Sequence, residues 1–396
     1  MRRIHIPLLL ANVDEARANG FVVLFTLDAA CRALMITIVP LMAYEILGDA
    51  QYVSVLYFAV SFAGLLIALT VPALLHLVRR RWVMTIGAAG YVASAVSLAT
   101  GTTGGLIAGL ALQVLATATL EVVINLYLLD HVPRRALNQF EPKRLLFAGT
   151  TFALGPWLGV TLDRNVAHNL TFLLIGVLAL MLVAVFWRLR LTEAVVRADP
   201  AKPPPNPLSF IRRFAAQPRL VLAWGLAVGR NCWWLMYFVY VPIYVTAAGY
   251  SPQTGGALVS LGLVPMIFVR LWGRIGTRIG IRRLLIAGYG LTGLATIGAA
   301  ATAGMPVVCM GFIWLGALFA TVIDGGGNVP YLRAVHPHER NAMTSVYMTF
   351  RHCSSLLAPG AFAVALMVAP LPVVFLTGGL CALSMAALSR YLPKGL

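Results

Sequence analysis

Long apolar runs follow one another along nearly the whole chain, and short polar stretches separate them. Most runs hold roughly 20 residues, which as an α-helix is enough to cross the ~30 Å hydrocarbon core of a bilayer. The pattern predicts an all-α integral membrane protein with twelve transmembrane helices, the last two divided at Pro370 and Pro372, in the segments 21–47, 52–77, 82–101, 105–130, 141–163, 168–190, 219–248, 253–276, 282–303, 306–332, 340–369 and 370–392.

One polar, basic and proline-rich stretch, at residues 191–213, interrupts this pattern in the middle of the chain. It divides the predicted spans into six and six. We therefore predict a cytoplasmic lead-in at 1–20, a six-helix bundle at 21–190, a cytoplasmic linker at 191–218 and a second six-helix bundle at 219–396.

The two halves repeat one another. Cys31 and Gly48 match Cys232 and Gly249 at an offset of 201 residues. Five further matches share an offset of 203: Glu121 with Asp324, Asn125 with Asn328, Val132 with Val335, Phe147 with Phe350, and Pro156 with Pro359. Such parallel repeats are expected where two bundles face one another around a central site, so the predicted bundles are pseudo-symmetric.

The composition agrees with a membrane protein, because 60% of the 396 residues are hydrophobic and only 11% are charged. The net charge of +17 comes from basic residues whose positions follow the predicted topology. With both termini in the cytoplasm, 26 of the 30 Lys and Arg lie on the cytoplasmic side, one (Arg164) lies outside and three lie within spans. This asymmetry follows the positive-inside rule, so no nucleic acid is needed as a partner.

Six ionisable side chains lie inside predicted spans, where each costs about 2.5–3.5 kcal/mol to insert. Counted from the nearest cytoplasmic end, all six fall in one layer at a depth of roughly 10–16 Å. The repeat gives three candidate pairs: Arg32 with Glu121, Arg230 with Asp324, and Asp28 with Arg351. Asp28 and Arg32 are also four residues apart, so a local pair on one helix face is the alternative. These residues are candidates for solute binding or proton coupling, and permanent packing pairs are the competing explanation.

The segment that contains Asp324 reads IDGGGNVPYL, and its three glycines and proline weaken a helix. In a membrane, freed backbone groups are tolerated where they line water or a binding site. We predict that this span bends between Asp324 and Asn328, whereas the matching span with Glu121 and Asn125 is stiffer. Close helix packing is the competing explanation for the glycines.

Aromatic residues concentrate in the span that holds Arg230. Trp233, Tyr237 and Tyr240 follow this arginine at helical intervals. A charged anchor beside an aromatic wall suits an amphiphilic solute, although such residues more often form a core or an interfacial belt.

All five cysteines lie within predicted spans, so we expect no disulfide. His352 and Cys353 could form a transition-metal site with Asp324 and Asn328, but spacing across two helices does not support it. We therefore predict no metal and no cofactor.

Several motifs resemble the major facilitator superfamily of transporters. DHVPRR from Asp130 is similar to its loop between helices 4 and 5, and GTTFALGPWLG from Gly149 is similar to the Gly-Pro motif of its fifth helix. GRIGTRIGIRR resembles its glycine-rich basic loop, with Gly273, Arg278, Gly280, Arg282 and Arg283 in place. The resemblance implies a monomer whose helices 1, 4, 7 and 10 line a central cavity, and a bacterial inner membrane as the location.

The Gly-Pro motif, with Gly155, Pro156 and Gly159, is associated with the drug:proton antiporter branch of that superfamily. Gly149, Gly155 and Gly159 are expected to allow close helix contact, and Pro156 frees a backbone carbonyl and kinks the span. This chain departs from the branch in helix 4, where Leu110 stands in place of an arginine before Gln113.

Together these features predict a secondary active transporter that moves a small organic solute, amphiphilic or anionic, by alternating access. Protons would drive efflux through Asp28, Glu121 or Asp324. A symporter or uniporter of the same fold, or a scaffold or sensor without transport, are the alternatives. No Walker motif and no nucleophile–base constellation is recognisable, which argues against a primary pump and an enzyme.

Overall fold

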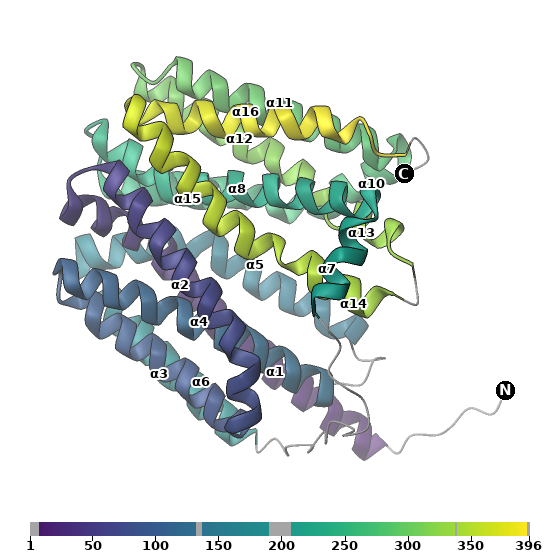
Figure 1. The fold of residues 1–396 in the computed structure, drawn as a ribbon. Coiled ribbons are helices and arrows are strands. Elements are labelled where there is room, and N and C mark those ends of the chain that lie inside the picture. Colours follow the sequence, from purple (N-terminus) through teal and green to yellow (C-terminus); the bar gives the residue numbers. More distant parts are fainter. Residues whose placement is uncertain (1–7, 132–136, 190–206, 337–338, 394–396) are drawn as a thin grey trace. The chain divides into compact units, whose positions relative to one another are not determined.

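The computed structural model describes residues 8–131, 137–189, 207–336 and 339–393, and these residues form helices and short connections without a strand. Figure 1 follows them in chain order from purple to yellow. The first half contains α1 (Leu8–Leu47), α2 (Ala50–Leu77), α3 (Arg80–Ala99), α4 (Thr103–His131), α5 (Leu137–Thr161), the π-helical turn η1 (Leu162–Val166) and α6 (Leu170–Arg188).

The second half contains more and shorter helices. They are α7 (Pro207–Ala215), α8 (Pro218–Ala247), α9 (Pro252–Leu263), the 3-10 turn η2 (Val264–Phe268), α10 (Val269–Ile279), α11 (Ile281–Ala301), α12 (Pro306–Gly326), α13 (Val329–Ala334), α14 (Arg340–Met348), α15 (Phe350–Val368) and α16 (Pro372–Ser389). The helices α8, α9, α12 and α16 begin with a proline in the first turn, where a missing N–H breaks no helical hydrogen bond.

The predicted all-α membrane architecture is confirmed. Among the described residues, nine helices are long and apolar enough to cross a membrane, and ten if one bent pair counts as a single span. The fifth and seventh predicted spans, at 141–163 and 219–248, are not among these ten, and the long helices α5 and α8 lie there.

Three predicted spans of the second half are broken. The eighth bends by 54° between Pro252–Phe268 and Leu271–Ile279, near Pro265, which has no N–H to donate. The motif expected as a loop from Gly273 is mostly helix α10, and only Gly280, at a φ of 90°, separates it from α11. The tenth span breaks at Gly327, and the eleventh consists of α14 and α15 with Thr349 between them.

The chain forms two compact units. Unit 1 comprises Met1–Ile38 and Phe62–Val196, and unit 2 comprises Val39–Ser61 and Arg197–Leu396. Both α1 and α2 therefore begin in one unit and end in the other. The domain division at the 191–218 linker stays a prediction, because residues 190–206 lie outside the described part.

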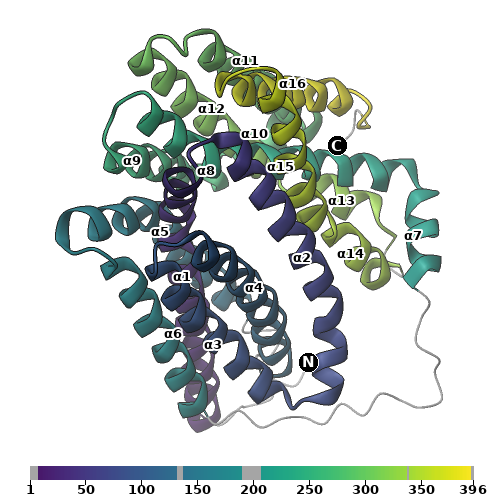
Figure 2. The ribbon, with the colours of Figure 1, turned by 60° about the vertical axis from the view of Figure 1, so that its left-hand side comes forward.

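In unit 1, α3 packs against α4 and α6, and these helices lie side by side in Figures 1 and 2. Helix α5 approaches α1 closely through Gly155 and Gly159. A Cβ at Gly159 would overlap the carbonyl group of Leu34, and a Cβ at Gly155 would overlap Ala33. The expected close contact is present at Gly155 and Gly159, but the expectation is wrong for Gly149, because an added Cβ there would meet nothing within 4 Å.

In unit 2, α11 packs between α12 and α16, and α8 packs against α9, α15 and α16. The first residues of α2 also belong to this unit. The Ser54 hydroxyl is 2.6 Å from the Tyr240 hydroxyl, and Phe58 packs where a Cβ at Gly360 would lie. The unit thus has α8 as a central element, and α8 carries Arg230.

Candidate functional site

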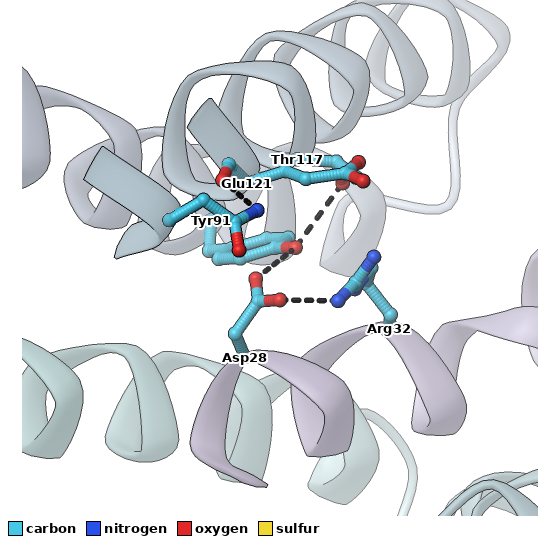
Figure 3. Close-up of polar contacts among 6 residues, drawn as sticks. Asp28, Arg32, Tyr91, Thr117 and Glu121 are labelled. Atoms are coloured by element: carbon cyan, nitrogen blue, oxygen red, sulfur yellow. Dashed lines mark hydrogen bonds and ion pairs between the residues drawn. The ribbon is translucent and has the colours of Figure 1, made fainter. Parts of the chain in front are cut away.

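The charged site of unit 1 lies between α1, α3 and α4 (Figure 3). Asp28 is buried, with 2% of its side chain exposed, and forms an ion pair with Arg32 one helical turn later. The Tyr91 hydroxyl of α3 donates to the second oxygen of Asp28 at 3.1 Å. Asp28 therefore has one cationic and one neutral partner, as a buried carboxylate requires.

Helix α4 brings a second acid to this site. The Tyr91 hydroxyl lies 3.1 Å from that of Thr117, and Glu121 lies one turn further along α4 (Figure 3). Glu121 is close enough for its charge to act on Arg32, whose Nε is buried and has no hydrogen-bond partner among the described residues. The Asn125 side-chain amide donates to the Glu121 backbone carbonyl at 2.7 Å, so this amide is hydrogen-bonded within α4.

Of the two predicted arrangements in this half, the structure therefore has the local one. Arg32 forms its ion pair with Asp28 on the same helix, and Glu121 is its electrostatic neighbour. The predicted pair between Asp28 and Arg351 joins the two units, so it stays a prediction.

In unit 2, the predicted pair between Arg230 and Asp324 is present. Arg230 Nε on α8 lies 3.5 Å from Asp324 Oδ1 on α12, and the two side chains are only 14% and 17% exposed. The Trp234 indole N–H donates to Asp324 Oδ2 at 3.0 Å. Asp324 thus repeats the pattern of Asp28, with one arginine and one neutral donor.

Asn328, at the start of α13, extends this network to α14. Its side-chain oxygen accepts from Tyr347 at 3.0 Å and from Arg230 Nη2 at 3.4 Å. The Tyr347 ring stacks on Tyr331 at 4.0 Å, and the Arg230 guanidinium lies 6.0 Å from the Phe350 ring centre. Arg230 is therefore held by groups from α12, α13 and α15, and Tyr347 reaches it through Asn328.

The predicted aromatic wall has a different composition. Trp233 donates to Thr296 at 2.9 Å and Tyr237 donates to the Leu258 carbonyl at 2.7 Å, and both side chains are buried in the core. Tyr240 contacts Ser54, away from Arg230. Trp234, which donates to Asp324, and Phe350, which lies near Arg230, are aromatic neighbours of this pair instead, so the core explanation fits Trp233 and Tyr237.

The competing explanation, close helix packing, accounts for two of the three glycines after Asp324. Gly325 and Gly326 pack closely, against Trp272 of α10 and Leu285 of α11 respectively. Gly327 adopts a φ of 47°, which L side chains rarely do, and ends α12. The helix is interrupted at Gly327 and Asn328, where the bend is predicted, and the bend itself stays a prediction.

The remaining candidates lie elsewhere. Arg351 and His352 are exposed at the start of α15, and no group of three metal-binding side chains occurs in the described part of the chain. Gly273 faces the Gly325 carbonyl at the α10–α12 crossing, Arg278 lies in the last turn of α10, and Gly280, Arg282 and Arg283 begin α11. Pro156 is buried in α5, and the side chain of Asp130 lies outside the described residues.

Sequence reasoning missed several members of the two sites, among them Trp234, Tyr91 and Tyr347. Trp234 follows Arg230 by four residues and shares its helix face, so its spacing was as good a signal as that of Trp233. Tyr91 and Tyr347 carry no comparable signal, because their roles depend on which neighbouring helix they face.

This arrangement can exchange charge at little structural cost. Each aspartate has a neutral hydrogen-bond donor whether it is ionised or protonated. The arginine partner of Asp324 lies on another helix, whereas that of Asp28 lies on the same helix. Arg32 and Arg230 can equally receive an anionic group from a bound molecule.

Comparison with known proteins agrees with this fold. The family profile of the Major Facilitator Superfamily matches residues 21–359. The chain is similar to the nucleoside transporter NupG (TM-score 0.72, 14% identity, 96% of this chain and 99% of that one). It is also similar to a D-xylose–proton symporter (0.72, 10%, 96% and 97%) and to the peptide transporter POT (0.72, 13%, 94% and 93%). No curated protein matches the chain by sequence. The chain belongs to the Major Facilitator Superfamily and is a transporter rather than an enzyme.

Proposed function

We propose that this protein is a proton-coupled secondary transporter that exports a small organic solute, amphiphilic or anionic, by alternating access, with Asp324 as the coupling acid. The supporting observation is the position of Asp324. Within the described part of the chain its cationic partner is Arg230, 3.5 Å away on another helix, and the helix that carries Asp324 ends three residues later at Gly327.

The physical reason is the cost of charge in a membrane. An ionised carboxylate near the midplane is stable only with a counter-charge, so Asp324 must take up a proton whenever Arg230 moves away. Gly327 allows the end of α12 to move relative to α13, and such a movement changes the distance between Asp324 and its arginine. Proton binding then follows the conformation of the transporter.

Asp28 is the less suitable coupling group. It pairs with Arg32 on the same helix, one turn away, and therefore keeps its partner when α1 moves as a rigid body. We assign Asp28 and Arg32 to solute binding together with Glu121.

Export rests on the Gly155–Pro156 motif of α5 and its resemblance to antiporters. In this mode an amphiphilic solute that carries no anionic group would compete with the proton for Asp324. A symporter is the second candidate, because the contact of Arg230 with Asn328 is long, at 3.4 Å, and an anion could replace it. An anion on Arg230 would leave Asp324 protonated, and solute and proton would then move together.

Proteoliposomes with an imposed pH gradient test this proposal. A panel of nucleosides, pentoses, dipeptides and amphiphilic organic acids is added, and an enclosed pH-sensitive dye reports proton movement together with radiolabel flux. We expect at least one compound to cause proton flux in wild-type liposomes and none in protein-free liposomes. Glu339→Gln, which changes an acid outside this site, serves as the matched control.

The direction of proton flux separates the candidates. Opposite movement of solute and proton supports export, and parallel movement supports symport. Solute flux without protons contradicts the coupling role of Asp324. Absence of flux for every class contradicts transport and favours a scaffold or sensor.

A further inference from the structure

We propose that α7 is an interfacial helix that binds the phosphate groups of anionic phospholipids through Arg212 and, from the first turn of α8, Arg219. This inference concerns a surface that is separate from the transport site. It does not depend on the solute or on proton coupling.

One face of α7 is firmly attached to unit 2. Phe214 is 5% exposed and belongs to the buried cluster that includes Leu220, Met343 and Tyr347, and Phe210 packs against the same cluster. Because α7 is anchored on this side, its opposite face points away from the buried cluster of unit 2.

A polar contact fixes one flank of the helix. Arg213 lies 3.1 Å from Glu339, and Gln217 donates to the other oxygen of Glu339 at 3.1 Å. Glu339 directly precedes α14. Arg213 is thus already paired, and Glu339 is occupied by two partners.

The outward face combines apolar and basic side chains. At about 100° per residue, Ile211 lies beside the anchored face and Arg212 follows on the side opposite to it. Ile211 is 51% exposed, and Arg212 and Arg219 are exposed and form no ion pair within the described part of the chain. The α7 sequence itself contains no acidic residue.

This pattern suits the boundary between acyl chains and headgroups. An exposed isoleucine next to arginines allows the apolar side chain to enter the acyl region while guanidinium groups contact phosphate. Charge complementarity therefore selects an anionic phospholipid as the partner. The predicted cytoplasmic position of the linker places α7 at the leaflet where anionic lipids attract basic segments.

Hydrogen–deuterium exchange of the full-length protein in nanodiscs tests the proposal. The probe is the lipid, either phosphatidylcholine alone or phosphatidylcholine mixed with phosphatidylglycerol. We expect exchange in α7 to slow when phosphatidylglycerol is present, by about fivefold for each arginine. The Arg212→Gln/Arg219→Gln variant should lose this slowing, and Arg212→Lys/Arg219→Lys should keep it because the charge remains. Arg390→Gln, which removes an exposed arginine after α16, should behave as wild type.

Two results would overturn the proposal. One is equal exchange of α7 in both lipids, which would mean that its basic face contacts water. The other is slowing that survives in the double glutamine variant, which would assign the lipid to other residues. Faster exchange in α11 as well would mean that the double variant destabilises unit 2 as a whole. In that case the single variants Arg212→Gln and Arg219→Gln replace it, and the same two results would overturn the proposal.

Discussion

Removing either partner of the Arg230–Asp324 pair should destabilise the protein, and removing both should cost no more than removing one. The separation of 3.5 Å corresponds to a gross attraction of about 5 kcal/mol at an effective dielectric constant of ~20. Breaking a buried pair costs about 3–5 kcal/mol, because one charge is left without compensation. The distance is longer than that of a strong charge-assisted hydrogen bond, so we expect the lower value, about 3 kcal/mol.

This prediction takes the form of a double-mutant cycle. Arg230→Ala and Asp324→Asn should each lower the free energy of unfolding by about 3 kcal/mol. The double variant should lose about 3 kcal/mol rather than the ~6 kcal/mol that independent effects would give. Unfolding in mixed micelles, followed by circular dichroism, provides the measurement.

A surface pair of the same unit serves as the control. Arg213 and Glu339 are 3.1 Å apart, but the arginine side chain is 62% exposed, so their coupling should be below about 1 kcal/mol. If the losses at Arg230 and Asp324 simply add, the two residues do not interact, and the proposed exchange of partners has no energetic basis.

Three further predictions concern the hydrogen bond from Trp234 to Asp324, the helix packing and the topology. Trp234→Phe removes the indole donor to Asp324 and should lower the free energy of unfolding by about 1.5–3 kcal/mol and slow pH-driven transport in proteoliposomes. Gly159→Ala places a methyl group on the Leu34 carbonyl and should cost about 1–3 kcal/mol in the same unfolding assay. Labelling of introduced cysteines with an impermeant reagent should find 48–51, 163–168 and 249–252 outside and 79–81, 195–206 and 336–340 inside.

Each of these predictions has an internal control. Trp233→Phe loses a hydrogen bond to Thr296 and should lower stability without changing pH-driven transport relative to exchange. Gly149→Ala meets no atom within 4 Å and should not destabilise the protein. Labelling of residues 249–252 from the cytoplasm would contradict the topology.

The sequence predicted the helices well, because the length of an apolar run is directly related to the thickness of a bilayer. It predicted only one of the places where helices are interrupted. Pro265 was visible, but a proline inside a span can be accommodated without a bend. Gly327 was predicted correctly because three consecutive glycines leave few alternatives to a break.

The charged residues were found from the sequence, whereas their neighbours were only partly found. A midplane charge is conspicuous because insertion is costly, which identified Asp28 and Asp324. Periodicity places residues on a helix face but does not state which helix that face meets. Trp233 was therefore chosen as a candidate and Trp234 was missed, although Trp234 is the one that donates to Asp324, and Tyr91 could not be recognised at all.

The most direct test of the account compares pH-driven accumulation with solute exchange in proteoliposomes that contain Asp324→Asn. Asparagine can accept the Trp234 hydrogen bond but cannot bind and release a proton. We expect this variant to lose accumulation driven by a pH gradient and to retain exchange, whereas Glu121→Gln should lower affinity or stability and keep the coupling. Accumulation by Asp324→Asn against a solute gradient at the wild-type rate would contradict the account.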